Sequence, residues 1–107
     1  MQTNNLVGDS SVDASTVVRR SEKQIACDMG GEVVILDLDS GTYYGLDQIG
    51  AAIWNAIEQP ASLVAIRDAI MAEYEVDAET CERDVVAFVE RMRGAGLVEV
   101  GGGGSAV

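Results

Sequence analysis

The chain has 107 residues, with 18 acidic and 7 basic side chains, no histidine and a net charge of −11. This length suits one compact domain and leaves no room for a second. The negative charge repels phosphate backbones, which disfavours nucleic-acid binding. Apolar runs are far shorter than the roughly 20 residues that a membrane-spanning helix needs, and the start lacks a signal pattern, so we expect a cytoplasmic protein.

Both ends of the chain are predicted to be flexible. Residues 1–17 mix Asn, Ser, Asp, Thr and Gly without an apolar period, although residues 16–18 are expected to begin pairing with the sheet. Residues 101–107 start with a Gly-Gly-Gly-Gly-Ser stretch that is identical to a common engineered linker unit. The folded domain is therefore expected at residues 18–100.

Between the tails, the residue pattern predicts three strands and then three helices. β-rich runs at 24–28, 32–38 and 42–46 are separated by two Gly-containing turn signals, which predicts an antiparallel meander. Downstream, the apolar residues take helical spacing, and Asp47, Ser62 and Asp77 are each placed to cap a helix, the third of which runs to Gly94. The expected fold class is α+β, of winged-helix shape.

No constellation typical of an active site is present. Without histidine, neither a Ser-His-Asp nor a Cys-His site can be assembled. Asp37, Asp39 and Gly41 are similar to the start of a calcium loop, but the required glycine and glutamate are missing further along. Cys27 and Cys81 are expected to be two separate reduced thiols in the core. We therefore expect no catalysis, no metal and no cofactor.

One strand edge and one helix flank are the candidates for binding. If the strand order follows the sequence, residues 42–46 form an edge strand with unpaired backbone groups. On the third helix, Val86 and Val89 are expected to stand beside a core stripe formed by Cys81, Val85, Phe88 and Met92. The edge and the flank together would suit an extended peptide bound as an added strand. The alternative is that Tyr43, Val86 and Val89 pack on the N-terminal segment or on a dimer partner.

Four runs, in their order and spacing, carry a family resemblance. Residues 32–47, 50–54, 81–85 and 96–98 read EVVILDLDSGTYYGLD, GAAIW, CERDV and GLV. Together they resemble the PqqD-like family of precursor-peptide recognition elements, and the strand residues are similar to those of stand-alone recognition proteins from lasso-peptide gene clusters. The resemblance spans about residues 17–100.

The resemblance implies a non-catalytic module that binds the leader region of a ribosomally made precursor peptide. The leader would add a fourth strand beside the third strand and lie against the third helix. The module would present it to a leader peptidase, a transglutaminase-like cysteine protease, and to an ATP-dependent cyclase. Carried over position by position, the implied peptide-binding residues are Thr42, Tyr43, Tyr44, Gly45 and Leu46 in the strand, and Asp84, Val85, Val86, Val89, Met92 and Arg93 in the helix.

Two other functions remain open from the sequence. The same fold could serve a radical SAM enzyme in the pyrroloquinoline quinone pathway or in another modified-peptide pathway. A winged-helix DNA-binding regulator is disfavoured because the exposed side of the third helix is mixed to acidic, where a DNA-reading helix should be basic.

From the sequence, we expect Val89→Glu to weaken leader binding strongly while leaving the fold intact, because Val89 is expected beside the core stripe. Titration calorimetry with a leader peptide measures the affinity, and an unchanged value would move the site elsewhere.

Overall fold

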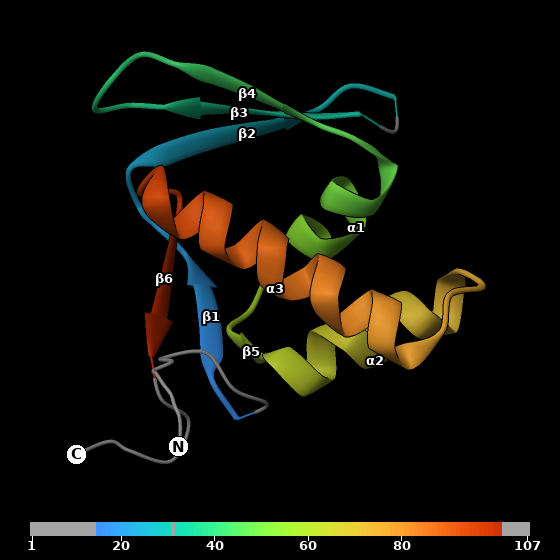
Figure 1. Ribbon diagram of the computed structural model, residues 1–107. Helices are drawn as coiled ribbons and strands as arrows, with labels where there is room; N and C mark the ends of the chain where they lie inside the picture. The colour runs from blue at the N-terminus through green and yellow to red at the C-terminus, as the bar shows by residue number, and fades with distance from the viewer. Residues whose placement is uncertain (1–14, 31, 102–107) are drawn as a thin grey trace.

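Figure 1 shows the computed structural model of the chain, which describes residues 15–30 and 32–101. The strands in these ranges are β1 (Val17–Arg20), β2 (Gln24–Asp28), β3 (Val33–Asp37), β4 (Tyr43–Leu46), β5 (Ala61–Ser62) and β6 (Val98–Gly101). The helices are α1 (Gln48–Ala56), α2 (Leu63–Glu73) and α3 (Ala78–Gly94). The strands form two antiparallel sheets, β2-β3-β4 and β5-β1-β6. The predicted α+β class is confirmed.

The predicted three-stranded meander is the β2-β3-β4 sheet. β3 pairs with β2 from Val33 to Asp37 and with β4 from Val33 to Leu36, so β3 is the central strand. Gly30 and Gly41 lie in the two connections with φ angles of 72° and 73°, a region that L side chains rarely adopt. These glycines let the chain turn back tightly at both ends of β3.

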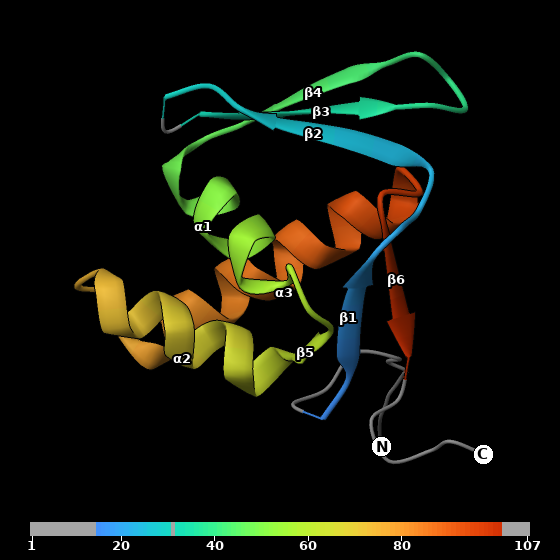
Figure 2. The ribbon, with the colours of Figure 1, turned by 180° about the vertical axis from the view of Figure 1, so that it is seen from behind.

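The β2-β3-β4 sheet is buried on one face only. Along β3, Val33 and Ile35 are buried, whereas Val34 and Leu36 on the opposite face are half-buried. Figures 1 and 2 show all three helices on one side of this sheet. The core lies between that inner face and the helices, where α1 contributes Trp54 and α3 a row of buried apolar side chains.

The three predicted helix caps are confirmed. A carboxylate oxygen of Asp47 accepts a hydrogen bond from the Gly50 N–H at 2.7 Å and starts α1. Ser62 and Asp77 accept from the backbone of Ala65 and Thr80 in the same way and start α2 and α3. Each bond satisfies one backbone donor that has no partner within its helix.

The second sheet corrects the sequence prediction. β1 pairs with β5 and β6 rather than with the meander, with Val18 opposite Ala61 on one side and Val100 on the other. Thr16 is 1% exposed, so the folded domain begins before residue 18, and Gly101 extends it to the last residue of β6. Strands of two to four residues are too short to show a sequence period. The rest of both predicted tails lies outside the described residues.

We predict that Asp37 makes the stability of the β3–β4 hairpin dependent on pH. Its carboxylate accepts from the Ser40 hydroxyl at 2.8 Å and from the Asp39 N–H at 3.0 Å, and these bonds hold the pKa of Asp37 below its ordinary value of 3.8. Because the folded pKa is lowered, this stabilisation is complete above the ordinary pKa and is lost as the pH falls through the lowered one.

Asp37→Ala should therefore lower the free energy of unfolding at neutral pH, and the difference from wild type should shrink below about pH 3. Urea denaturation of both proteins at neutral pH and below about pH 3 measures this difference in the free energy of unfolding. A difference that stays constant with pH would show that ionisation of Asp37 plays no part.

Candidate peptide-binding site

β4 has a free edge. Within the described residues it pairs with β3 alone, so the prediction that the third strand of the meander is an edge strand is confirmed. The Asp37 N–H donates to the Thr42 carbonyl at 2.9 Å, which makes residues 37 and 42 a hydrogen-bonded pair. Because such pairs alternate along an antiparallel ladder, the N–H and C=O groups of Tyr43 and Gly45 point away from β3. These four groups can bond an incoming strand.

A hollow begins one residue after β4 ends. Its volume is about 310 Å³, and its lining comes from the start of α1 and one face of α3. The residues that line it are Asp47, Ile49, Gly50, Ile53, Asp84, Ala87, Phe88 and Arg91. The β2 edge differs, because the smaller cavity there is lined by β1 and the end of α1 without α3. The free edge of β4 is therefore the one that continues into a hollow against α3.

Phe88 and Gly50 shape the floor of this hollow. Phe88 is 6% exposed, and its ring lies so close to Gly50 that a Cβ added there would sit 3.2 Å from the Phe88 Cε1 atom. The absence of a side chain at Gly50 lets the first turn of α1 approach α3 closely. The floor is thus apolar and set by packing.

The rim of the hollow carries both signs of charge. Asp47 is occupied by its capping bond, while Asp84 and Arg91 are exposed on α3 and have no ion pair within the described ranges. The guanidinium carbon of Arg91 lies 5.7 Å from the centre of the Phe88 ring, within cation–π range. A ligand in the hollow would meet an aromatic floor between a carboxylate and a guanidinium.

A smaller apolar hollow continues the same groove. It has a volume of about 100 Å³ and shares Ile49 and Asp84 with the larger one. Its other lining residues are Ile70, Val76, Cys81 and Val85. The groove therefore extends along α3 toward the start of that helix.

The structure places the five predicted strand residues in two groups. Tyr43 and Gly45 are exposed and direct their backbone groups to the free edge, and Thr42 is exposed just before the strand. Tyr44 is half-buried on the inner face, and Leu46 is 6% exposed in the core. Only the first group is directly accessible to a ligand.

On α3, the prediction that Val89 stands beside the core is wrong. Val85, Val89 and Met92 are each 1% exposed, so all three belong to the core, and of these only Val85 also lines the groove. A glutamate at position 89 would be a buried charge, so the structure leads us to expect that Val89→Glu destabilises the fold rather than leaving it intact. Asp84 alone among the predicted rim residues lines the larger hollow.

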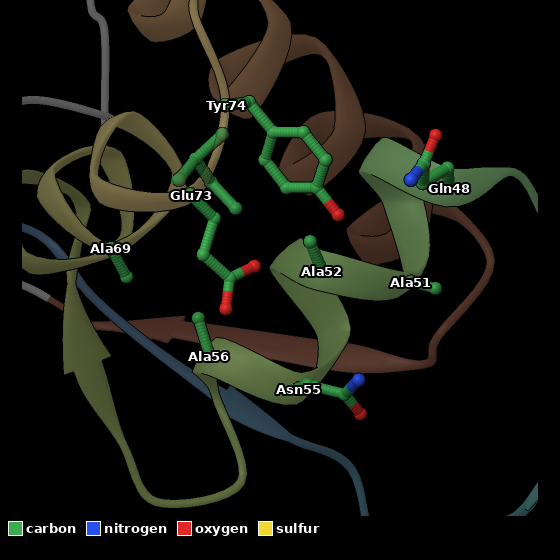
Figure 3. A pocket seen from close by; sticks show the side chains of 9 residues that line it. Gln48, Ala51, Ala52, Asn55, Ala56, Ala69, Glu73 and Tyr74 are labelled. Carbon is green, nitrogen blue, oxygen red and sulfur yellow. The ribbon is translucent and has the colours of Figure 1, made fainter. Parts of the chain in front are cut away.

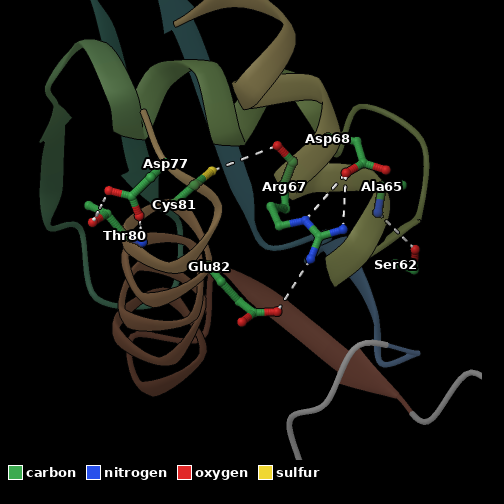
Figure 4. A network of polar contacts seen from close by, with 8 residues as sticks. All are labelled: Ser62, Ala65, Arg67, Asp68, Asp77, Thr80, Cys81 and Glu82. Carbon is green, nitrogen blue, oxygen red and sulfur yellow. Dashed lines mark hydrogen bonds and ion pairs between the residues drawn. The ribbon is translucent and has the colours of Figure 1, made fainter. Parts of the chain in front are cut away.

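Val86 and Arg93 lie on another side of α3. Val86 follows Glu82 by one helical turn, and the Glu82 carboxylate is 3.6 Å from the Arg67 guanidinium of α2 (Figure 4). Arg93, about two turns further on, forms an ion pair with Glu90 at 2.8 Å. Neither residue lines the groove, which instead receives Ala87, Phe88 and Arg91, a set that sequence reasoning missed.

The two cysteines are free but differ in environment. Cys81 is buried, and its thiol donates to the Arg67 carbonyl at 3.7 Å (Figure 4). Burial raises the pKa of the Cys81 thiol, which keeps it neutral and unreactive. Cys27 is exposed, so the expectation that it lies in the core is wrong.

A cavity of about 420 Å³ lies on the opposite face of α1, against α2. Figure 3 shows the Glu73 carboxylate and the Tyr74 hydroxyl directed into it, above the small side chains of Ala52 and Ala56. It uses neither β4 nor α3. Within residues 15–30 and 32–101, no cluster of three or more His, Cys, Asp or Glu could hold a metal ion, and no helix is long and apolar enough to cross a membrane.

Comparison with known proteins identifies the family. The sequence profile described as "Coenzyme PQQ synthesis protein D (PqqD)" matches residues 32–98, which include β3, β4, all three helices and the groove. The chain belongs to the PqqD family. No curated protein sequence matches this PqqD-family chain.

Two solved structures are similar to it. "TbiB1 in Complex with the TbiA(beta) Leader Peptide" is 38% identical with a TM-score of 0.72, and the match covers 83% of this chain and 99% of that one. "Lasso peptide synthetase B1 complexed with the leader peptide" is 26% identical with a TM-score of 0.69, and the match covers 77% and 96% of the two chains. Both relatives were solved with a leader peptide bound.

Two glutamate substitutions on α3 test which residues the core needs. Val89→Glu should destabilise the domain by more than about 3 kcal/mol, because it buries an unpaired charge. Ala87→Glu should change the stability by less than about 1 kcal/mol, because Ala87 is exposed at the rim of the hollow. Thermal unfolding followed by circular dichroism measures both. A folded Val89→Glu protein with wild-type stability would contradict the assignment of Val89 to the core.

Proposed function

We propose that this chain captures the leader of a ribosomally made precursor peptide at the β4 edge and presents it to separate maturation enzymes. The observation that carries the proposal is the outward-pointing backbone of Tyr43 and Gly45 at an edge that runs into the groove along α3. The two leader-bound relatives support it, because the match covers nearly their whole length.

The energetics of strand addition fit a binding module. The four outward groups of Tyr43 and Gly45 would contribute about 1 kcal/mol net each, which roughly offsets the ordering of the peptide. Affinity would then depend on apolar peptide side chains inserted into the hollow above Phe88 and into the smaller hollow beyond it. Burial of two such side chains at about 1.5–3 kcal/mol each would contribute about 3–6 kcal/mol, which corresponds to a dissociation constant between the millimolar range and tens of micromolar.

In this proposal the chain catalyses nothing. The groove offers Asp84, Arg91 and the capping carboxylate of Asp47, and the chain has no histidine to act as a general base. The proposed enzymes are a transglutaminase-like cysteine protease that removes the leader and an ATP-dependent cyclase that closes the core peptide. Holding the leader raises its effective concentration at these enzymes. Since precursor peptides are made by ribosomes, the module would work in the cytoplasm.

A second candidate is delivery of a precursor peptide to a radical SAM enzyme in coenzyme PQQ synthesis or a related pathway. The description of the matching family profile favours this reading. The name of one of the two similar structures, a lasso peptide synthetase B1, favours lasso-peptide synthesis. Both candidates use the same groove and differ in the enzyme that is served.

Gly45→Pro tests strand addition directly. It removes an N–H that points away from β3, so the β3–β4 ladder keeps its bonds, and proline is tolerated at a strand edge in this orientation. Loss of one ladder bond, together with the bulk of the ring at the edge, should weaken leader binding by at least about ten-fold. Calorimetric titration with a synthetic TbiA(beta) leader peptide, the ligand in the structure of the 38% identical relative, measures this.

Gly45→Ala is the matched control. It keeps the N–H, and an added Cβ meets no atom within 4 Å, so the affinity should remain within about two-fold of wild type. If Gly45→Pro, with an unchanged circular dichroism spectrum, bound the leader as tightly as Gly45→Ala, strand addition at β4 would be ruled out.

A further inference from the structure

The cavity between α1 and α2 lies apart from the hollow beside β4. Its volume is about 420 Å³, against about 310 Å³ for that hollow, and the two share no lining residue. One face of α1 and the C-terminal end of α2 supply its walls. A ligand in this cavity would therefore leave the hollow beside β4 open.

Small side chains keep the cavity open. Ala52 and Ala56 are four residues apart and so lie on the same face of α1, and Ala69 lines the cavity from α2. Figure 3 shows these three methyl groups around the space between the helices. A larger side chain at any of these positions would occupy part of that space. The floor of the cavity is therefore apolar.

Two polar groups converge on the cavity from the end of α2. Figure 3 shows the Glu73 carboxylate and the Tyr74 hydroxyl directed into it. Neither side chain has a hydrogen-bond or ion-pair partner in the part of the chain that the structure describes. The amide side chains of Gln48 and Asn55 complete the lining, which includes no lysine or arginine. The cavity thus presents an unpaired carboxylate next to an aromatic ring.

This chemistry is complementary to a guanidinium group. A guanidinium is planar and can donate two parallel N–H bonds to one carboxylate, here that of Glu73. It is also more weakly hydrated than an ammonium and packs well on an aromatic ring, here that of Tyr74. The methylene stem of an arginine would cover the alanine floor. An anion would be repelled both by Glu73 and by the net charge of −11.

We propose that the cavity between α1 and α2 binds the guanidinium of an arginine side chain presented by another polypeptide. The proposal goes beyond leader capture and does not depend on it, because the cavity uses neither β4 nor α3. The negative charge of the chain attracts a basic partner, and Glu73 gives that attraction one defined position. An arginine bound there would anchor its polypeptide to α1 and α2.

N-acetyl-arginine amide is the probe, because it carries the side chain without terminal charges. Its titration should produce saturable shifts in the backbone amide NMR signals of Ala52, Ala56 and Ala69, with a dissociation constant of about 1 mM. The neutral isostere N-acetyl-citrulline amide should bind at least about ten-fold more weakly, because it has no charge to pair with the carboxylate. Methylguanidine lacks the methylene stem and should bind at least about five-fold more weakly than the arginine probe.

Two matched pairs of variants locate the site. Glu73→Gln removes the carboxylate charge and should weaken binding of the arginine probe at least about five-fold, whereas Glu75→Gln removes a charge outside the lining and should change it less than about two-fold. Ala69→Leu fills part of the cavity and should weaken binding at least about five-fold without a change of charge. Ala72→Leu, at an exposed position outside the lining, should change it less than about two-fold.

Each comparison has an outcome that overturns the inference. Equal losses in Glu73→Gln and Glu75→Gln would show general attraction to an acidic surface. Wild-type affinity in Ala69→Leu would place the probe outside the cavity. Methylguanidine that binds as tightly as the arginine probe would indicate a site for a free small cation instead of an arginine side chain. Wild-type spectra without saturable shifts would show that no site exists. Circular dichroism spectra that match wild type confirm that each variant is folded.

Discussion

The one-sided burial of a three-stranded sheet is the constraint on which the rest of this structure depends. Val33 and Ile35 of β3 face the helices and fix which side of the sheet is the core. β3 is the only strand of this sheet bonded on both sides, so β2 and β4 each keep a free edge. The same arrangement leaves the opposite face uncovered by any described element. A free edge and an open face are therefore direct consequences of how few strands the sheet has.

The groove arises because one side of α3 packs in the core and the neighbouring side borders the hollow. Its central stripe, with Val85, Val89 and Met92, fills the core, and the adjoining side with Ala87 and Arg91 borders the hollow beside β4. Phe88 lies between the two and contributes to both. Because the floor of the hollow is also part of the core, its shape is held by packing rather than by flexible side chains.

The β4 edge and the groove would contribute different interactions to peptide binding. The β4 edge offers backbone hydrogen bonds, which any peptide sequence can accept, and the groove adds selectivity through an aromatic floor and charges of both signs.

The sequence alone determined the meander, the three helices and their caps, because period-2 and period-3.6 patterns, turn glycines and capping side chains at Asp47, Ser62 and Asp77 act locally. It also indicated the edge position of β4, since consecutive strands of a meander pair in order. The second sheet depended on tertiary structure, because β1, β5 and β6 are too short to show a pattern and pair with segments far away in the sequence. Which side of α3 borders the groove was likewise decided by packing. Val89 and Ala87 both lie next to the predicted stripe. Packing against the rest of the fold buries Val89, whereas Ala87 remains exposed.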